Sequence, residues 1–382
     1  MSFRTTSTQS DVAIVGAGPA GLSCAIAAAN QGLQVELIDA MQPGIDKACG
    51  EGLMPGSLTA LAALGFDLNQ DLSQIETALL RGVRFLGDQV TTEARFPAGP
   101  GRGIRRTILH QLLLGRAMAL GVRCHWQNSV QGITQADDST LICTNRQTLR
   151  TRYLIGADGH QSRIAKWAGL EKSSTHSRRI GLRQHYTITP WTDLVEVYWN
   201  DHGQAYVTPI SSSEVCVAFI SNTKFPSSVE ALKHFPALVQ RLASAQPNGA
   251  PRGSITLGRR LHHVTTSNIA LVGDASGAVD AVTGEGMALC FRQAAALASA
   301  LKANNLAAYQ YAHRGLQRLP SLMSRSLLLM DRYPRLRART LHTFERNPKL
   351  FSSLLRVHIG HSPMNFFGAD GLLATGLHIL AN

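Results

Sequence analysis

The chain has 382 residues, of which 44% are hydrophobic and 16% are charged, and its formal net charge is +12. This apolar content supports a large core, and the length exceeds that of one minimal domain. No stretch reaches the ~18 uninterrupted apolar residues of a membrane span, and the first ten residues are too polar for a signal peptide. We therefore expect a soluble, cytoplasmic protein.

The cysteines are scattered along the chain without any CxxC pair; they are Cys24, Cys49, Cys124, Cys143, Cys216 and Cys290. This spacing argues against a zinc site and against a disulfide scaffold, and it fits a reducing compartment. We predict no metal site, and we interpret most of these cysteines as small buried hydrophobic residues.

The first predicted elements form a βαβ unit. Residues 11–16 are apolar almost throughout, which is typical of a buried parallel strand. Residues 21–31 follow as an alanine-rich helix, and residues 35–39 follow as a second strand. A strand, a crossover helix and a second strand in this order predict a nucleotide-binding type of fold.

The turn between the first strand and the helix reads Gly-Ala-Gly-Pro-Ala-Gly. Gly16 permits the tight turn, Gly18 lets the backbone approach a pyrophosphate, and Gly21 allows close helix–strand packing. The phosphate then lies at the helix N-terminus. Asp39 ends the second strand, where an acid accepts hydrogen bonds from ribose hydroxyls. The predicted dinucleotide contacts are Gly16, Gly18, Ala20, Gly21, Asp39 and Ala40.

Further elements follow in chain order: strands within 83–96, a helix near 107–120, a strand at 153–157, alternating strands from 179 to 258, a strand at 268–272 and a helix at 286–303. The alternation between 179 and 258 is typical of an antiparallel sheet with one solvated face. The fold class we predict is α/β, with a Rossmann-type nucleotide domain, an inserted antiparallel sheet and a helical C-terminal tail.

Two further motifs identify the dinucleotide as FAD. Asp158 follows the strand at 153–157, and Gly273-Asp274 follow the strand at 268–272. The segment Thr-Gly-Glu-Gly-Met at 283–287 then opens a helix, whose N–H donors stabilise negative charge at the flavin ring. The predicted flavin contacts are Asp158, Gly273, Asp274, Gly284, Gly286 and Met287.

With these motifs present, the sequence resembles the class A flavoprotein monooxygenases and the geranylgeranyl reductases, which share a p-hydroxybenzoate hydroxylase-like fold. The resemblance covers about residues 10–310. It implies that Arg106, which matches the start of the family's RxxLxxxL helix, lies close to the flavin. The resemblance and the strand pattern together predict an FAD-binding domain at 8–80, 104–175 and 262–310, a substrate domain at 81–103 and 176–261, and a helical region at 311–382.

Some segments of the sequence resemble the reductase branch of this superfamily, and others resemble the monooxygenase branch. The Thr-Gly-Glu-Gly form and the segment Lys-Ala-Cys-Gly-Glu-Gly-Leu at 47–53 resemble the reductases. The YxWxFP signature of many reductases is absent, and the segments 181–186 and 206–209 resemble bacterial monooxygenases encoded beside polyketide synthases. The absence of WxWxIP disfavours halogenases.

The predicted catalytic residues are Cys49, His185 and Tyr206. Cys49 lies in a glycine-flanked loop with Glu51. A thiol in that place can donate a proton in alkene reduction, sense the redox state, or simply pack beside the flavin. His185 is a candidate general base for a phenolic substrate, because histidine commonly has that role, although alternating residues of a sheet usually only pack.

The function we favour from the sequence is an NAD(P)H-dependent FAD monooxygenase that hydroxylates a small aromatic or polyketide-like substrate with oxygen activated at the flavin. Because there is only one GxGxxG motif, NAD(P)H would bind transiently. The alternatives are a reductase of isoprenoid double bonds, a flavoenzyme that modifies an aromatic side chain of a partner protein, and a non-catalytic interaction protein.

Residues 313–356 hold ten Lys or Arg residues and two acids. A basic, leucine-rich segment of this kind is typical of a solvated helix face, and the alternative is peripheral contact with a membrane surface or an anionic partner. No recognition motif accompanies the charge, so we predict no nucleic-acid binding.

Overall fold

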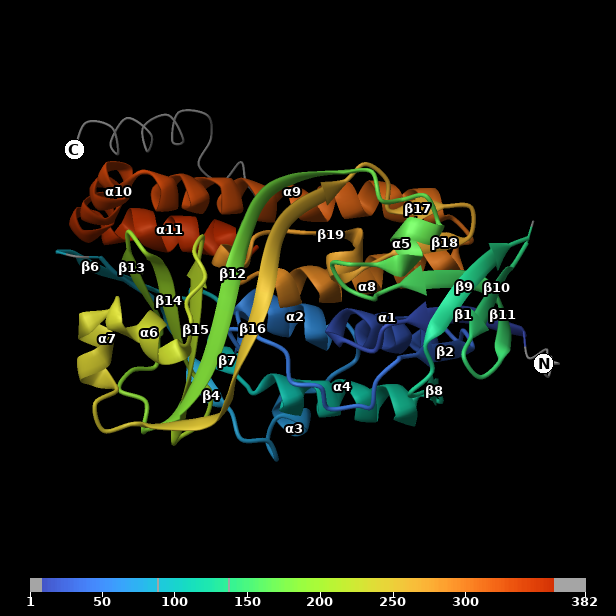
Figure 1. Cartoon of the computed structure of the whole chain (residues 1–382), viewed down its shortest axis with the longest axis horizontal. Coiled ribbons are helices and arrows are strands. Elements are labelled where there is room, and N and C mark those ends of the chain that lie inside the picture. Colours follow the sequence, from blue (N-terminus) through green and yellow to red (C-terminus); the bar gives the residue numbers. More distant parts are fainter. Residues whose placement is uncertain (1–8, 88, 137, 361–382) are drawn as a thin grey trace.

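The computed structural model describes residues 9–87, 89–136 and 138–360, which form an elongated molecule built around two large β-sheets (Figure 1). The sheet nearest the N-terminus lies at the right of this view, and the second sheet lies at the left. This arrangement confirms the predicted α/β fold class.

The first sheet, here called the nucleotide sheet, has the order β17 (Thr265–Thr266), β18 (Ile269–Leu271), β11 (Thr148–Gly156), β1 (Gln9–Val15), β2 (Val35–Ile38) and β8 (Arg123–His125). From β18 to β8 every pairing is parallel. The carboxyl ends of these strands therefore meet at one edge of the sheet, which is where open α/β sheets bind ligands.

Helices cover this sheet as the hydrophobic pattern predicts. Helix α1 (Pro19–Asn30) begins with proline at its first turn and is buried along most of its length, because it packs against both α8 (Gly286–Lys302) and α4 (Arg106–Ala119). A hairpin of β9 (Val130–Gln135) and β10 (Thr140–Thr144), which the sequence did not reveal, extends from β11.

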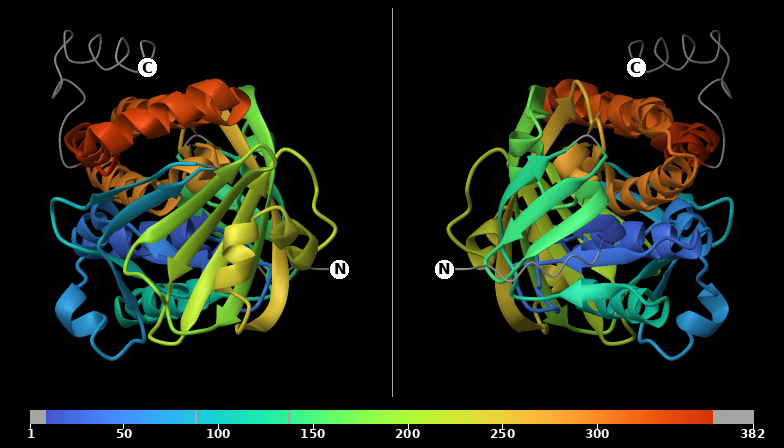
Figure 2. Two further views of the ribbon diagram at one scale, coloured as in Figure 1. Left: turned by 90° about the vertical axis from the view of Figure 1, so that its left-hand side faces the viewer. Right: turned by 90° about the vertical axis from the view of Figure 1, so that its right-hand side faces the viewer.

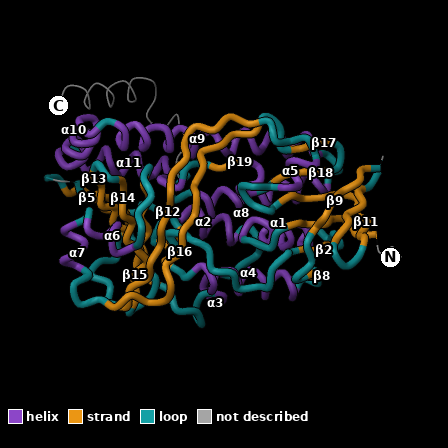
Figure 3. Tube along the Cα trace, viewed as in Figure 1, coloured by secondary structure: helices purple, strands orange, loops and turns teal. Residues whose placement is uncertain are grey.

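The second sheet, here called the inserted sheet, has the order β19 (Gly277–Ala278), β16 (Gln246–Leu261), β12 (Ser173–Thr187), β15 (Glu214–Ser221), β14 (Gly203–Pro209), β13 (Val195–Asn200), β5 (Gly82–Leu86) and β6 (Thr91–Arg95). Figure 3 shows that the long strands β12 and β16 run from the region of β17 down to the far end of the inserted sheet. They connect the two halves of the molecule.

Two short helices, α6 (Ser228–Lys233) and α7 (Pro236–Arg241), cover one face of the inserted sheet. Figure 2 shows them against that face, and the buried contact includes Phe235 and Phe219. The opposite face of the sheet is therefore the one available to the nucleotide half.

A small sheet of β3 (Gly52–Leu53), β7 (Gly101–Gly103) and β4 (Ala78–Leu80) lies at the junction of the two halves. A Cβ on Gly103 would come within 1.7 Å of the Pro209 carbonyl oxygen, so only glycine allows β7 to approach β14 this closely. Helices α2 (Pro55–Ala62) and α3 (Leu68–Asp71) follow β3 along the chain.

Three helices, α9 (Leu306–Arg332), α10 (Pro334–Arg346) and α11 (Pro348–His358), form the layer at the top of Figures 1 and 2. They agree with the predicted helical C-terminal region as far as residue 360; residues 361–382 of that prediction lie outside the described part. Among the described helices, none is both long and apolar enough to cross a membrane.

A buried ion-pair cluster attaches α9 to the inserted sheet. The Arg179 guanidinium on β12 lies 3.3 Å from the Asp331 carboxylate on α9 and donates a hydrogen bond of 2.6 Å to Gln204. Gln204 and Trp199 both donate to the same Asp331 carboxylate oxygen. Because every member has a partner, this cluster fixes the position of α9 without leaving a bare charge in the interior.

Candidate flavin and substrate site

The glycine motif between β1 and α1 adopts the geometry of a phosphate-binding turn. Gly16 has φ +103°, and a Cβ there would lie 2.4 Å from the Ala157 carbonyl oxygen. A Cβ on Gly21 would lie 1.8 Å from the Gly16 carbonyl oxygen. In contrast, nothing lies within 4 Å of the position of a Cβ on Gly18, so the chain leaves open space at that point.

Asp39 links the end of β2 to this turn. Its carboxylate accepts hydrogen bonds of 2.7 Å from the Ala17 backbone N–H and 2.9 Å from the Met41 backbone N–H. Ala40, beside it, is exposed. The predicted phosphate and ribose contacts thus lie at one edge of the nucleotide sheet.

The remaining predicted flavin contacts either follow the neighbouring strands β11 and β18 at the same edge or lie at the start of α8. Asp158 comes after β11 and accepts hydrogen bonds from the first turn of α5 (Arg163–Trp167). A Cβ on Gly273 would lie 2.6 Å from the Ala20 side chain, and Asp274 is exposed. Gly284, Gly286 and the half-buried Met287 open α8.

This edge has donors and acceptors that fit a bound dinucleotide. Neither α1 nor α8 has a side-chain cap or an acid in its first turn, so their N-terminal N–H groups are free to bind phosphate or the flavin ring. One Asp158 oxygen and the Gln293 amide nitrogen are buried and, among the described residues, lack a hydrogen-bond partner. These groups, with the space beside Gly18, suit FAD.

Arg106 lies between the phosphate turn and the loop that precedes β3. Its guanidinium donates to the Ile45 carbonyl oxygen at 3.4 Å. Burial raises the pKa of Cys49 and of Cys290, a residue of α8, and the positive charge of Arg106 partly opposes that rise at both thiols. One turn further along α4, the His110 ring lies 3.0 Å from the Ala17 carbonyl oxygen. The start of α4 thus contacts both segments.

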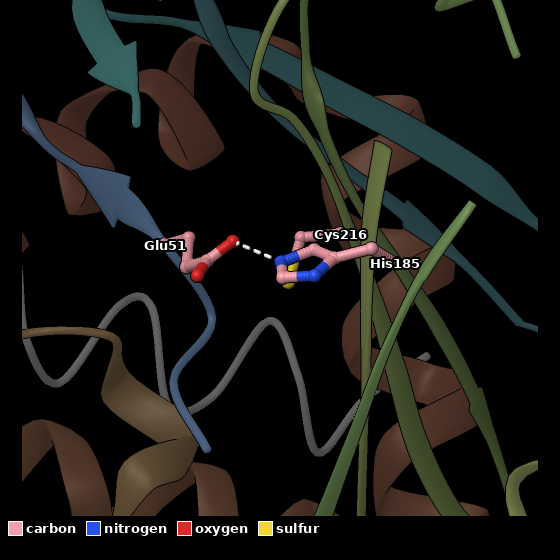
Figure 4. A group of neighbouring side chains, drawn as sticks. All are labelled: Glu51, His185 and Cys216. Carbon is pink, nitrogen blue, oxygen red and sulfur yellow. Dashed lines mark hydrogen bonds and ion pairs between the residues drawn. The ribbon is translucent and has the colours of Figure 1, made fainter. Parts of the chain in front are cut away.

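A buried carboxylate and imidazole pair connects the two halves of the molecule. Figure 4 shows Glu51 and His185 pointing toward each other from the loop before β3 and from β12, with a Glu51 Oε2–His185 Nε2 distance of 2.6 Å. The other Glu51 oxygen accepts a hydrogen bond of 2.9 Å from the Arg106 backbone N–H, at the first residue of α4. One carboxylate therefore caps α4 and binds the inserted sheet.

The backbone at Glu51 is arranged for this contact. Glu51 has φ +58°, a left-handed conformation that costs a non-glycine residue of order 1 kcal/mol or more and that the surrounding structure must enforce. Glycines on both sides, Gly50 and Gly52, permit the sharp change of direction. The conformation directs the Glu51 side chain inward, where it is 4% exposed as a residue.

The contact made by the second ring nitrogen of His185 determines which nitrogen carries the proton. His185 Nδ1 lies 2.9 Å from the Arg183 guanidinium, which can only donate. Nδ1 is therefore an acceptor, and the proton is on Nε2, which donates to Glu51. Arg183 is itself buried and pairs with Asp46, whose other oxygen accepts from Arg252.

The same protonation argues against a metal ion at this point. Glu51, His185 and Cys216 each place one ligand atom within 4.8 Å of the others, which is close enough for a shared metal ion (Figure 4). A metal at His185 Nε2 would require the ring proton on Nδ1, where the Arg183 guanidinium already donates. We therefore assign this group as a hydrogen-bonded cluster.

Two thiols lie beside the pair and both are held in the neutral form. Burial raises the pKa of the Cys49 thiol, and the Glu51 carboxylate raises it further. Burial likewise raises the pKa of Cys216 well above its usual value. The Cys216 thiol donates to the Cys49 carbonyl oxygen at 3.5 Å, and the Glu51 backbone N–H donates to Cys49 Sγ at 3.4 Å.

Tyr206 lies on the same face of the inserted sheet as His185, but its hydroxyl group binds a different segment of the chain. Cross-strand pairing aligns His185 with Cys216, and Arg183 with Ala218 and Tyr206. The Tyr206 hydroxyl donates to the Val282 carbonyl oxygen at 2.9 Å, and burial raises its pKa. It therefore holds η2 (Ala281–Thr283), the turn that precedes Gly284.

Several residues of this cluster went unnoticed in the sequence. The period-two alternation of β12 places Arg183 and His185 on one face, and a charged residue there signals a buried polar partner. Asp46 and Cys216 gave no local signal, because their roles depend on long-range contacts. Glu285 is also buried, and burial raises its pKa.

These features define an FAD-dependent oxidoreductase of the superfamily that includes the class A flavoprotein monooxygenases and the geranylgeranyl reductases. The chain belongs to the family described as FAD binding domain, whose family model matches residues 9–305. The predicted cofactor and the predicted enzyme class are thereby confirmed.

Curated relatives and a solved structure agree with this assignment. The chain is 29% identical to a menaquinone reductase of Mycobacterium tuberculosis, over 85% of this chain and 80% of the relative. It is 27% identical to digeranylgeranylglycerophospholipid reductase 1 of Methanothermobacter thermautotrophicus, over 73% of this chain and 74% of the relative. The flavin-dependent brominase Bmp2 has a similar fold, with a TM-score of 0.81 and 19% identity over 98% of each chain.

The phosphate turn gives the first prediction. Replacing Gly18 with Val should abolish FAD binding, because the added side chain enters the space that the pyrophosphate needs. The measurement is the FAD content per protein chain, from absorbance after release. Gly132→Val is a matched control, since Gly132 in strand β9 also has open space around its Cβ position. Stoichiometric FAD in Gly18→Val would contradict the assigned phosphate position.

The Cys49–Glu51 contact gives a second prediction, on pH dependence. The Glu51 carboxylate helps to keep the pKa of Cys49 high, so Glu51→Gln should lower that pKa and raise the thiolate fraction at a given pH. The measurement is the pH profile of alkylation by iodoacetamide, corrected with a Cys49→Ala variant. Glu76→Gln, an exposed site, is the control. An unchanged profile in Glu51→Gln would show that the carboxylate does not act on Cys49.

Proposed function

We propose that this protein is a reductase that saturates a carbon–carbon double bond in the isoprenoid chain of a lipid, with Cys49 as the proton donor. The observation that carries the proposal is the position of the Cys49 thiol, which accepts from the Glu51 backbone N–H beside the Glu51–His185 pair and whose pKa is raised by burial and by the Glu51 carboxylate. An acid that must release a proton in the reaction has to be protonated at rest, and the raised pKa of Cys49 meets that condition.

The named relatives support a substrate of this class. A menaquinone and a digeranylgeranyl lipid both carry isoprenoid chains with double bonds. The segment Lys-Ala-Cys-Gly-Glu-Gly-Leu at 47–53, which resembles the reductase branch, is the one that contains Cys49 and Glu51. The motif and the relatives thus favour the same reaction.

The chemistry that FAD supplies when bound is the transfer of a hydride, two electrons and one proton, to one carbon of the double bond. The Cys49 S–H bond then breaks, and its proton goes to the other carbon. The thiolate that remains is stabilised by the Glu51 backbone N–H, and by the nearby positive charges of Arg106 and Arg183. It regains a proton from solvent before the next turnover. NAD(P)H is our proposed source of the electrons.

Hydroxylation of an aromatic substrate, which the sequence favoured, remains the competing proposal. In that reaction His185 was a candidate base for a phenolic substrate. In the structure His185 is 2% exposed, donates to Glu51, and receives a hydrogen bond from Arg183. With both nitrogens engaged, His185 is better suited to hold the loop of Cys49 than to accept a substrate proton.

The reaction itself distinguishes these proposals. The FAD-loaded protein is reduced chemically in the absence of oxygen and incubated with a geranylgeranyl lipid or a menaquinone. The mass of the product is then measured by mass spectrometry. We expect a gain of two hydrogen atoms for each reduced bond. A product that forms only in air and carries an atom of labelled oxygen would contradict the reductase and support the monooxygenase.

The third prediction concerns the proton donor. Cys49→Ala should lower the rate of alkene reduction by about a hundredfold or more, because a positioned acid contributes roughly that factor. FAD content and the rate of flavin reduction should not change. Cys124→Ala serves as the control, since Cys124 is another partly buried cysteine whose pKa is raised by burial. A loss of only a few-fold in Cys49→Ala would mean that the proton comes from elsewhere.

A further inference from the structure

We propose that the outer face of α9 is a docking surface for an anionic phospholipid bilayer. The surface consists of exposed residues that recur every three or four positions along α9: Tyr311, Arg314, Arg318, Leu322, Arg325, Leu329 and Arg332. At 100° per residue these side chains fall within an arc of about 80°, and they extend over about 32 Å of helix. We call this set the α9 stripe.

Among the residues that the structure describes, the charges of the α9 stripe have no acidic partner. All four charged members are arginines, and Asp331, the acid of α9, points inward and pairs with Arg179. Within the described residues, Arg318 and Arg325 make no hydrogen bond or ion pair. A solvated helix face normally mixes both signs, so a row of arginines alone favours an anionic surface.

The apolar members of the stripe are unusual for a water-facing helix. Tyr311 is 82% exposed, Leu322 is 44% exposed and Leu329 is 49% exposed. Tyr333, directly after the helix, is 47% exposed. Alternating arginine with tyrosine and leucine matches the interface of a bilayer, where guanidinium groups meet lipid phosphates and apolar side chains enter the acyl boundary.

The opposite face of α9 is packed against the rest of the protein, so the α9 stripe lies on a helix whose position is fixed. His313 on that face lies 3.0 Å from the Ser276 hydroxyl, and Asp331 joins the buried cluster on the inserted sheet. Figure 1 shows α9 lying along the upper side of the molecule, in one layer with α10 and α11. The charge and the exposed apolar residues are therefore available together on one side.

Docking of the α9 stripe on a bilayer is independent of the proposed reaction, because it concerns membrane binding and not turnover. Co-sedimentation of the full FAD-loaded chain with phosphatidylcholine vesicles, with and without phosphatidylglycerol, tests it directly. We expect binding only when phosphatidylglycerol is present, and we expect it to weaken as salt increases.

Two variants test the stripe itself. Arg318→Glu with Arg325→Glu should lower the affinity for phosphatidylglycerol vesicles by more than about thirtyfold, since each basic residue near an anionic surface contributes several-fold. Leu322→Ser with Leu329→Ser should weaken binding at every salt concentration. The control is Lys224→Glu with Lys233→Glu, which makes the same change in net charge at exposed sites on α6 and the loop before it.

Equal loss in the control variant would overturn the proposal, because net charge alone would then explain binding. No vesicle binding by the unmodified chain would also overturn it. If gel filtration showed instead a dimer that the arginine variant dissociates, the α9 stripe would be a contact between two copies. None of these results depends on which reaction the enzyme catalyses.

Discussion

The hydrogen bond between Glu51 and His185 is the constraint on which the site depends. Glu51 is a buried carboxylate, and such a group is tolerated only if its oxygens are bonded. One oxygen accepts from His185 on the inserted sheet, and the other accepts from the backbone at the start of α4. The loop before β3 therefore has one position in which its charge is satisfied, and that position joins the nucleotide half to the inserted sheet.

The chemistry of Cys49 follows from this constraint. Cys49 is two residues before Glu51, so the carboxylate that fixes the loop also acts on the thiol and keeps it neutral. Arg183 engages the far nitrogen of His185, which sets the ring's proton on the side of Glu51. Asp46 in turn pairs with Arg183, so the two ends of the 46–51 loop hold the same strand of the inserted sheet. Positioning and proton chemistry are thus parts of one network.

The sequence predicted those parts of the molecule that depend on local pattern. The glycine motif and Asp39 report geometry at the ends of β1 and β2, because Gly16 and Gly21 permit close backbone approaches and Gly18 leaves open space. The alternation of apolar and polar residues in β12 and β15 predicted the inserted sheet. The predicted FAD contacts that follow β1, β2, β11 and β18 lie at one edge of the nucleotide sheet, as parallel strands require, but their contact with the cofactor stays a prediction.

The partners inside the site could not be predicted, because they are far apart in the chain. His185 looked like a free base, since nothing near it in sequence indicates that Glu51 and Arg183 occupy both nitrogens. Tyr206 looked catalytic, and its hydroxyl instead holds the backbone at Val282. The β9–β10 hairpin and helices α6 and α7 were missed because short elements carry too little periodicity to identify.

The most direct test of the central claim is a double-mutant cycle between Glu51 and His185. The free energy of unfolding is measured by urea denaturation for the parent, Glu51→Gln, His185→Asn and the double variant. If the two side chains share a buried, charge-assisted hydrogen bond, the cycle should give a coupling energy of about 1.5–3 kcal/mol. Additive effects, within about 0.5 kcal/mol, would contradict the claim that this bond joins the two halves of the enzyme.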